Sequence, residues 1–215
     1  YDSSVASDDF YSTADSTWCI NEDECSNTIC SNYPYISTGR LPVNNISDGQ
    51  RYLTKLQSFL NNSSTETIWK NRILLVSDDA YKGGSFKSSE LLHTEYSDSI
   101  FRELYRYSDA IQLYGVNYPR IDSQIGDLHF DLNNDLINLI NHGAGIINYI
   151  GHGDVNTWSS EYMLSNERGD LERINIENNK LAIWIAGTCS FGKYYFDDSP
   201  TFMEEILFKE DGAIS

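Results

Sequence analysis

The feature of this sequence that most constrains its fold is a regular alternation between short apolar runs and longer segments with helical periodicity. The apolar runs are residues 72–77 (RILLVS), 110–114 (AIQLY), 144–150 (AGIINYI) and 181–187 (LAIWIAG). Between them, the spacing of apolar side chains predicts helices at residues 88–104, from Leu132 to an end at Gly143, and at residues 170–177. Strands that alternate with helices pair in parallel and carry helices on both faces of the sheet. We therefore predict an α/β fold with a mostly parallel sheet.

One of the apolar runs is expected at the centre of that sheet. Residues 144–150 are too continuously apolar to keep one face in water, which is typical of a strand buried on both sides. Residues 181–187 are predicted to form another buried strand. After the second run, Ser199 is predicted to cap a helix that has Pro200 at its first position and Gly212 beyond its end. The last residues of the chain would then begin a further strand.

The first part of the chain is polar and irregular. We predict that residues 1–47 pack on the core as a polar segment with a cysteine-containing loop, and that residues 48–215 form the domain itself. Asp48 is predicted to cap the first helix of that domain. Because the chain opens in polar sequence without Met and stops where a strand begins, we expect it to be a fragment of a longer protein.

Three of the four cysteines lie close together, in the acidic stretch CINEDECSNTIC. The spacings of Cys19, Cys25 and Cys30 do not fit the paired CxxC pattern of a zinc ribbon. A local disulfide in an oxidising compartment is the simpler expectation, with one of the three left unpaired. Cys189 stands far downstream, so we expect it to have a different role.

The net charge of −17 excludes some partners. Binding to nucleic acid or to an anionic membrane needs basic patches, and we find none in the sequence. An acidic surface is typical of a soluble protein or of one that binds cations such as calcium. No apolar run approaches the ~20 residues that a membrane-spanning helix requires.

His152 and Cys189 occupy equivalent places after the two most apolar runs. His152 lies two residues beyond Ile150 in NYIGHG, and Cys189 lies two residues beyond Gly187 in IAGTCSFG. The carboxyl ends of parallel strands meet at one edge of a sheet, where functional groups gather. If the two strands are neighbours, ~4.8 Å apart, the imidazole and the thiol can meet.

Such a pair is typical of catalysis by a cysteine nucleophile. A free thiol has a pKa near ~8.5, and a neighbouring imidazole raises the fraction of reactive thiolate. We interpret Cys189 as the nucleophile and His152 as the base, which later protonates the departing amine. The backbone N–H groups of Gly153 and Cys189 would hold the oxyanion. Without this pairing, Cys189 would be a small buried hydrophobe and His152 a turn residue.

Other side chains near this edge each have two interpretations. Asp78 and Asp79 follow the RILLVS run, where a carboxylate would orient the histidine ring, but they equally suit a helix cap or a calcium site. Trp158, and Tyr194 within KYYFDD, would either wall a substrate pocket or simply pack. Structural roles are expected for the three other histidines, His93, His129 and His142.

Taken together, these segments resemble the gingipain-type cysteine peptidases, peptidase family C25, which are caspase-like in fold. NYIGHG, NNKLAIWIAGTCSFG and SPTFMEEILFKEDGAIS are similar to that family's histidine and cysteine blocks in order and spacing. PYISTGRLPV and WKNRILLVSDD resemble the family's preceding segments, so the likeness covers nearly the whole chain. The CINEDECSNTIC stretch departs from the family pattern.

The resemblance implies a three-layer α/β/α fold and cysteine-type endopeptidase activity. No cofactor would be required, and Ca²⁺ would serve at most as a structural ion. Catalysis would fall to His152 and Cys189, with Gly153 at the oxyanion site. Asp79 aligns with the family's third acidic residue, and Glu90 with an acidic residue of the substrate pocket.

Within the family, SDDFY, GRLPV and KNRILLVSDD look most like the signal peptidase and sortase of the type IX secretion system. This likeness implies protein substrates whose C-terminal sorting signals are removed, with water or an amine as acceptor. It also implies outer-membrane secretion components as partners, and a location at the extracellular or outer-membrane surface of a Gram-negative bacterium. Two alternatives stay open: a general secreted gingipain-like endopeptidase, and a non-catalytic surface or calcium-binding assembly domain on the same scaffold.

Overall fold

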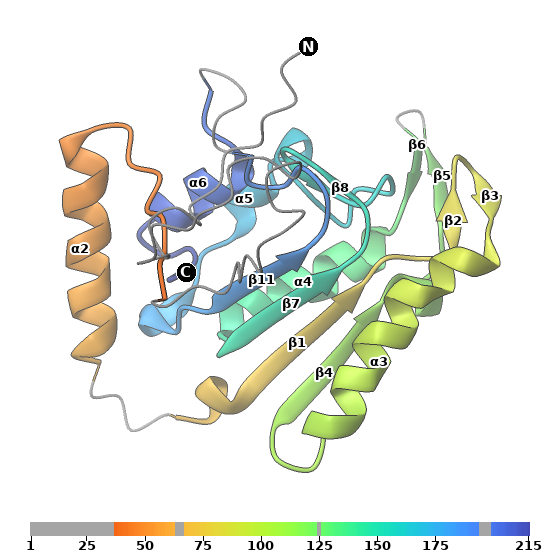
Figure 1. Ribbon diagram of the computed structural model, residues 1–215, viewed down its shortest axis with the longest axis horizontal. Helices are drawn as coiled ribbons and strands as arrows, with labels where there is room; N and C mark the ends of the chain where they lie inside the picture. Colours follow the sequence, from red (N-terminus) through yellow and green to blue (C-terminus); the bar gives the residue numbers. More distant parts are fainter. Residues whose placement is uncertain (1–36, 63–66, 124–125, 194–198) are drawn as a thin grey trace, which may run out of the picture. The chain divides into compact units, whose positions relative to one another are not determined.

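The computed structural model in Figure 1 describes residues 37–62, 67–123, 126–193 and 199–215. The chain divides into two compact units, residues 1–43 and residues 44–215. Every helix and strand named below belongs to the second unit. Cys19, Cys25 and Cys30 lie outside the described residues, so the local disulfide stays a prediction.

A four-stranded parallel sheet forms the centre of the second unit. Its strands are β1 (Arg72–Ser77), β4 (Asp109–Tyr114), β7 (Ile146–Ile150) and β11 (Ile183–Gly187). They are ordered β11-β7-β1-β4, and every neighbouring pair is parallel. The predicted parallel sheet is therefore confirmed, and each strand falls on one of the apolar runs.

Two helices flank this sheet, α3 (Leu92–Leu104), which follows the 3-10 turn η3 (Ser88–Leu91), and α4 (Phe130–His142). Figure 1 shows α3 on one face of the sheet and α4 on the other. α4 buries Leu132, Leu136 and Ile140 in the hydrophobic core that also contains Ile147 of β7. It ends at Gly143, whose φ of 90° favours glycine. The predicted three-layer α/β/α fold is confirmed.

The helix α2 (Ile46–Leu60) begins at a different cap from the predicted one. The side-chain oxygen of Asn45 accepts a hydrogen bond from the backbone N–H of Asp48 at 3.0 Å. Asp48 therefore lies in the first turn, where a carboxylate is favoured by the helix dipole. Among the described residues, no helix is long and apolar enough to cross a lipid bilayer.

The helix α6 (Phe202–Phe208) is capped by Thr201 rather than by the predicted Ser199. The Thr201 side chain accepts the backbone N–H of Glu204, and the Glu204 carboxylate accepts the backbone N–H of Thr201. This reciprocal capping box satisfies two free N–H groups at once, which a serine two residues earlier cannot do.

The predicted helix over residues 170–177 is only one turn long, α5 (Asp170–Arg173). Ile174 follows it in extended conformation and is fully buried. Ile176 is also extended and 4% exposed. The isoleucines thus continue as buried extended chain, because burying both apolar side chains favours this path over a longer surface helix.

β11 is much more exposed than predicted. Ile183 and Ile185 are 45% and 49% exposed, whereas Ile147 of the neighbouring β7 is fully buried. β11 is the last strand in the order of the sheet. The last residues of the chain, which were predicted to begin a further strand, lie along the outer edge of β11. There the backbone N–H of Trp184 donates to the carbonyl of Ser215 at 2.7 Å. The prediction of a buried strand at residues 181–187 is therefore wrong for β11.

Short strands and 3-10 turns complete the unit. Two hairpins are formed by β2 (Tyr81–Lys82) with β3 (Ser85–Phe86), and by β5 (Ile121–Ser123) with β6 (Gly126–Leu128). A small antiparallel sheet contains β8 (Gly153–Asp154), β9 (Thr157–Trp158) and β10 (Leu164–Ser165). The remaining 3-10 turns are η2 (Ile68–Asn71), η4 (Gly115–Asn117), η5 (Asn166–Arg168) and η6 (Glu177–Asn179).

Candidate active site

The register between β7 and β11 brings the two predicted catalytic residues to the same edge of the sheet. Ile150 is paired with Gly187, and the N–H of Gly151 donates to the carbonyl of Gly187 at 3.3 Å. His152 and Cys189 each follow this pair by two residues. The strands that carry them are therefore neighbours, and the two strand exits have the same offset.

Gly153 shows how closely the two exits approach each other. A Cβ atom added to Gly153 would collide with the side-chain oxygen of Thr188, the residue before Cys189. Thr188 therefore packs against the backbone that follows His152. This close approach is a physical reason for glycine at position 153, since any larger residue would push the two strand exits apart.

The backbone of His152 is held by three hydrogen bonds. Its N–H donates to the Asp78 carboxylate at 2.9 Å. Its carbonyl accepts the Tyr149 hydroxyl at 2.6 Å and the backbone N–H of Ser159 at 2.9 Å. Asp78 and Tyr149 are buried, with exposures of 1% and 0%. The turn that carries the histidine is thus fixed from two sides.

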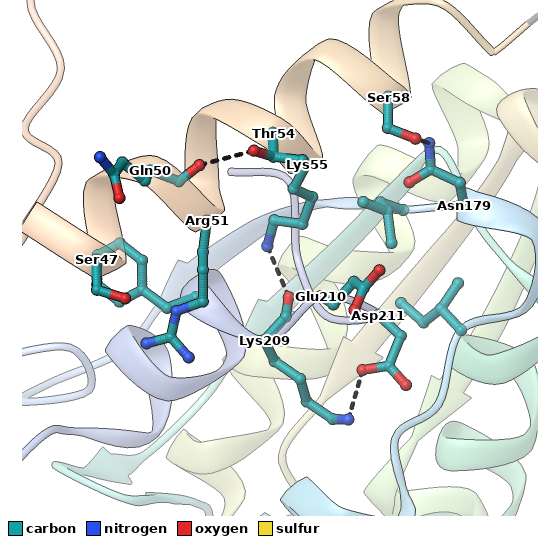
Figure 2. A pocket seen from close by; sticks show the side chains of 13 residues that line it. Ser47, Gln50, Arg51, Thr54, Lys55, Ser58, Asn179, Lys209, Glu210 and Asp211 are labelled. Carbon is teal, nitrogen blue, oxygen red and sulfur yellow. Dashed lines mark hydrogen bonds and ion pairs between the residues drawn. The ribbon is translucent and has the colours of Figure 1, made fainter.

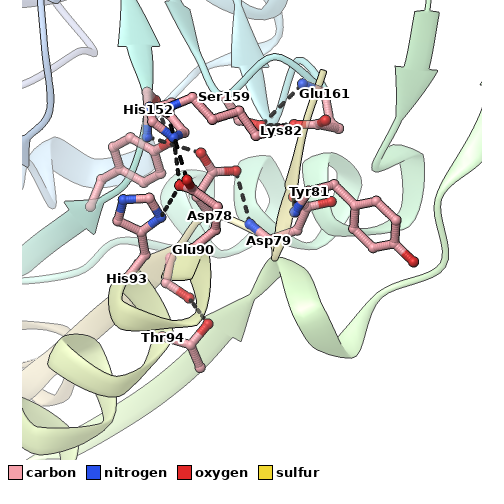
Figure 3. A network of polar contacts seen from close by, with 12 residues as sticks. Asp78, Asp79, Tyr81, Lys82, Glu90, His93, Thr94, His152, Ser159 and Glu161 are labelled. Atoms are coloured by element: carbon pink, nitrogen blue, oxygen red, sulfur yellow. Dashed lines mark hydrogen bonds and ion pairs between the residues drawn. The ribbon is translucent and has the colours of Figure 1, made fainter. Parts of the chain in front are cut away.

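The ring of His152 is held by Glu90 rather than by Asp79. Its Nε2 lies 2.8 Å from Glu90 Oε2, and Figure 3 shows Glu90 reaching this ring from η3. The hydrogen bond from His152 is the main cause that lowers the pKa of Glu90. An ionised carboxylate can only accept a hydrogen bond, so a neutral imidazole in this position has its proton on Nε2 and its lone pair on Nδ1. The carboxylate that contacts the histidine ring is therefore Glu90 and not the predicted Asp79, while the pocket role of Glu90 stays a prediction.

Asp79 serves a separate buried network. Its Oδ2 lies 3.0 Å from Nε2 of His129, and its Oδ1 accepts the backbone N–H of Tyr81 at 2.7 Å. Arg120 lies 3.4 Å from Asp79 and 3.6 Å from Glu161. His129 is fully buried, in keeping with the structural role predicted for it. Both bonds of Asp79 thus serve residues other than His152.

Three buried carboxylates lie close together behind the histidine. One oxygen from each of Asp78, Asp79 and Glu161 lies within 4.8 Å of the others. Burial raises the pKa of Asp78 and of Glu161, although hydrogen bonds to each oppose the shift. Arg120 supplies positive charge to the same group. Calcium binding at Asp78 and Asp79 stays a prediction. The Arg120 guanidinium already provides one positive charge beside Asp79 and Glu161.

Cys189 is a free, exposed cysteine. It is therefore not the small buried hydrophobe of the alternative interpretation. Exposure is what a nucleophile needs, because the substrate carbonyl must reach the sulfur. The sheet edge thus combines an accessible thiol with a histidine whose backbone and ring are both held in place.

Trp158 packs in the core and does not wall an open pocket. It is fully buried, and it stacks on Tyr149 with ring centroids 4.4 Å apart and planes 6° apart. Its ring also lies 5.6 Å from the rings of Trp184 and Phe191. The packing interpretation is therefore correct for Trp158. Tyr194 lies outside the described residues, so its pocket role stays a prediction.

A cavity of about 920 Å³ lies away from these residues, between α2 and the segment after α6 (Figure 2). Its lining includes Arg51, Lys55 and Asp211. Lys55 is 5% exposed, and its ammonium donates to the backbone carbonyls of Leu207, Lys209 and Ala213. Figure 2 shows Lys55 reaching across from α2. None of the predicted catalytic residues lines this cavity.

The contact of His93 with the His152 ring was not predicted from the sequence. Its ring meets the His152 ring edge to face, with centroids 5.0 Å apart at 82°. Its Nδ1 lies 3.9 Å from Glu90 Oε2. The signal available in the sequence was its spacing of three from Glu90, which places both on one side of a helical turn.

The fold is similar to that of solved cysteine proteinases. The crystal structure of the Arg-specific cysteine proteinase gingipain R (RgpB) matches with a TM-score of 0.63 and 20% identity, covering 85% of this chain and 39% of that chain. The complex of Porphyromonas gingivalis RgpB pro- and mature domains matches with a TM-score of 0.62 and 18% identity, covering 85% and 40%. At these identities the likeness shows the caspase-like α/β fold. The chain spans about two fifths of the gingipain chains that it matches.

The family itself comes from the sequence comparison. The model of peptidase family C25 matches residues 1–215, so the chain belongs to peptidase family C25. A search of curated proteins finds no match. The family and the fold expected from the sequence motifs are thus confirmed.

Proposed function

We propose that this protein is a cysteine peptidase that cleaves peptide bonds through Cys189 and His152. The observation that carries the proposal is the pairing of Ile150 with Gly187, because it gives the two residues equal offsets on neighbouring strands. The non-catalytic scaffold is disfavoured by the same observation. It would not need an exposed thiol at the same sheet edge as a histidine held by four hydrogen bonds.

In the first half of the reaction, the Cys189 sulfur attacks the carbonyl carbon of the substrate. His152 takes the thiol proton on Nδ1, and the negative charge of Glu90 stabilises the imidazolium that results. The oxyanion is held by the backbone N–H groups of Gly153 and Cys189. When the carbon–nitrogen bond breaks, His152 returns the proton to the departing amine and a thioester remains on Cys189.

In the second half, a nucleophile resolves the thioester. His152, again neutral, takes a proton from water or from an amine as it attacks, and the thiol of Cys189 leaves. Water gives a free carboxylate, whereas an amine gives a new amide bond. The residues around His152 serve both reactions equally, so the acceptor depends on the substrate side of the site.

For the substrate, we propose C-terminal sorting signals of proteins secreted by the type IX system, with the protein acting as their signal peptidase and sortase. The support is the likeness of SDDFY, GRLPV and KNRILLVSDD to that branch of the family. This role would place the protein at the extracellular or outer-membrane surface of a Gram-negative bacterium, beside outer-membrane secretion components. The reaction described above needs no cofactor, and Ca²⁺ would act only on structure.

The test is product analysis of the full-length protein with a secreted substrate that carries its C-terminal signal. Mass spectrometry should find a substrate cut before the signal, ending in a carboxylate or, when an amine is supplied, in an amide. The Cys189→Ala variant should give no product, while the neighbouring exposed-residue variant Ser190→Ala should cleave normally. Normal cleavage by Cys189→Ala would refute the peptidase. Cleavage at many sites instead of one would favour a general endopeptidase.

A further inference from the structure

Two histidines and a buried carboxylate converge beside the proposed catalytic centre. Asp78, His93 and His152 each place one ligand atom within 4.8 Å of the other two. They come from three separate parts of the chain, namely the end of β1, the helix α3 and the exit of β7. Figure 3 shows both rings turned toward the carboxylates of Asp78 and Glu90.

We propose that Asp78, His93 and His152 form a binding site for a divalent transition-metal ion such as Zn²⁺, and that metal binding there inhibits the enzyme. The inhibitory part rests on the proposed function, while the metal site does not. Sequence reasoning treated His93 as structural, and the catalytic scheme does not use it.

The spacing of the three groups fits a metal after small side-chain rotations. Zinc binds imidazole nitrogen at ~2.0–2.1 Å and carboxylate oxygen at ~2.0–2.2 Å in a tetrahedron, so neighbouring ligand atoms lie roughly 3.3 Å apart. From 4.8 Å or less, each side chain needs to move by about 1 Å. His93 and His152 are both partly exposed, so their rings have room for such a rotation.

The second observation is an unused nitrogen on His93. Its Nδ1 is buried and makes no hydrogen bond with any residue that the structure describes. The 3.9 Å to Glu90 Oε2 is too long for one. A buried imidazole nitrogen without a partner has a desolvation cost, and a metal ion would offset that cost.

The supporting contacts are also those of a metal site. Glu90 accepts the proton of His152 Nε2, which is the carboxylate–histidine arrangement that fixes ring orientation in metal sites. Asp78 is itself fixed, because it accepts the backbone N–H groups of His152 and Asp79. Two imidazoles and one carboxylate favour Zn²⁺, Co²⁺ or Ni²⁺ over Ca²⁺ or Mg²⁺, which prefer oxygen ligands.

Metal binding and catalysis compete for the same electron pair. A neutral imidazole has one basic lone pair, because its other nitrogen carries the proton. When His152 gives this lone pair to a metal, it cannot take the proton of Cys189. The site would therefore stop the peptidase as zinc rises and release it when zinc is removed.

The experiment measures metal binding directly, with Zn²⁺ by calorimetry and Co²⁺ by visible absorption, on the full-length protein. His93→Ala and the larger His93→Gln remove one ligand. His142→Ala is the matched control, because His142 is an exposed histidine that bonds to a carbonyl of its own helix. We expect one equivalent of metal in the wild type and in His142→Ala, and at least ~10-fold weaker binding in both His93 variants.

Cysteine ligands would have a different signature. A cobalt complex with thiolates has a strong near-ultraviolet charge-transfer band, and its affinity would not depend on His93. Unchanged binding in both His93 variants, or no binding by the wild type, would overturn the metal site. Peptidase assays with and without Zn²⁺ then test inhibition, expected in the wild type and His142→Ala and weaker in the His93 variants. Binding that depends on His93 in a protein with no peptidase activity would refute the proposed function and leave the metal site standing.

Discussion

The two strand exits at the edge of the sheet are built in opposite ways. At the exit of β7, His152 is held through its N–H, its carbonyl and its ring, by Asp78 directly after β1, Tyr149 of β7 and Glu90 of η3. At the exit of β11, Cys189 is exposed and free, on a strand whose isoleucines are half exposed. The histidine side is therefore fixed by polar contacts, and the cysteine side is open.

This difference follows from what each residue must do. A general base works only if its lone pair has one direction, which requires hydrogen bonds on the rest of the residue. A nucleophile must be reached by a substrate, so few contacts can surround it. We expect substitutions on the histidine side to change stability and activity together, and substitutions at Cys189 to change activity alone.

The largest effect is expected for Cys189→Ala. Peptide cleavage should fall by at least ~10³-fold, because no other group can form the thioester. The free energy of unfolding should change by less than about 0.5 kcal/mol, because the side chain is exposed. Cleavage assays and urea unfolding measure the two effects. A large loss of stability would show that the cysteine side is as structural as the histidine side.

Asp78→Ala should affect both properties. It leaves the part-buried N–H of His152 and the buried N–H of Asp79 without their acceptor, at a cost of about 2–4 kcal/mol in the free energy of unfolding. Activity should fall as well, since the turn that carries His152 loses its support. Asp78→Asn keeps one side-chain oxygen and should recover part of both losses. An unchanged unfolding curve for Asp78→Ala would contradict the claim that buried polar contacts fix the exit of β7.

Lys55 stabilises the chain segment that hydrogen-bonds to β11. Its ammonium binds the carbonyls of Leu207, Lys209 and Ala213, and the next residues, 214–215, form backbone hydrogen bonds with Ala182 and Trp184. Burial lowers the pKa of Lys55 from 10.5 to about 8, against the opposing charge of Asp211. Between these two values the unfolded chain binds the proton and the folded chain does not, so this group makes the wild type more stable as pH rises. Lys55→Met should destabilise by about 2 kcal/mol at pH 7 through its unpaired carbonyls.

The pH dependence of that difference is the sharper measurement. The stability gap between wild type and Lys55→Met should widen as pH rises from 8 to 10.5, by at most about 3 kcal/mol. Lys209→Met is a suitable control, because Lys209 is a partly exposed lysine of the same segment. A gap that narrows over this range would mean that the ammonium is favoured by its three carbonyls more than burial disfavours it.

The smallest effect is expected for Glu90→Gln. The amide oxygen can still accept the His152 proton, but it cannot stabilise the imidazolium by charge, so kcat should fall about tenfold. KM should change little if Glu90 acts through the histidine and not on the substrate. Glu90→Asp should restore part of kcat. A large rise in KM with unchanged kcat would instead indicate that Glu90 binds the substrate, as the predicted pocket role requires.

Much of the fold could be predicted because the apolar runs report directly on the strands. The positions of β1, β4, β7 and β11, and the end of α4 at Gly143, follow from periodicity and from glycine. The exposure of Ile183 and Ile185 could not be predicted in this way. Composition reports that a strand is apolar, whereas its exposure depends on which segments pack against each face.

The sequence predicted the site residues whose positions follow from strand order, and it did not predict the contacts that depend on the paths of loops. His152 and Cys189 follow their strands directly, so parallel pairing places them together. Glu90 lies in a 3-10 turn that follows a hairpin, 62 residues before His152, and no periodicity indicates that contact. Asp79 was predicted from the resemblance to the family. The sequence pattern itself does not tell which of two adjacent carboxylates, Asp78 or Asp79, faces a neighbouring strand.

The most direct test of the proposed pair is the rate at which a thiol-directed acylating peptide probe labels Cys189. If His152 takes the thiol proton, His152→Ala should slow labelling by about 100-fold or more, with little change in the affinity for the probe. Cys189→Ala should not be labelled at all. Equal labelling rates in the wild type and in His152→Ala would contradict the account, because the cysteine would then act without the histidine.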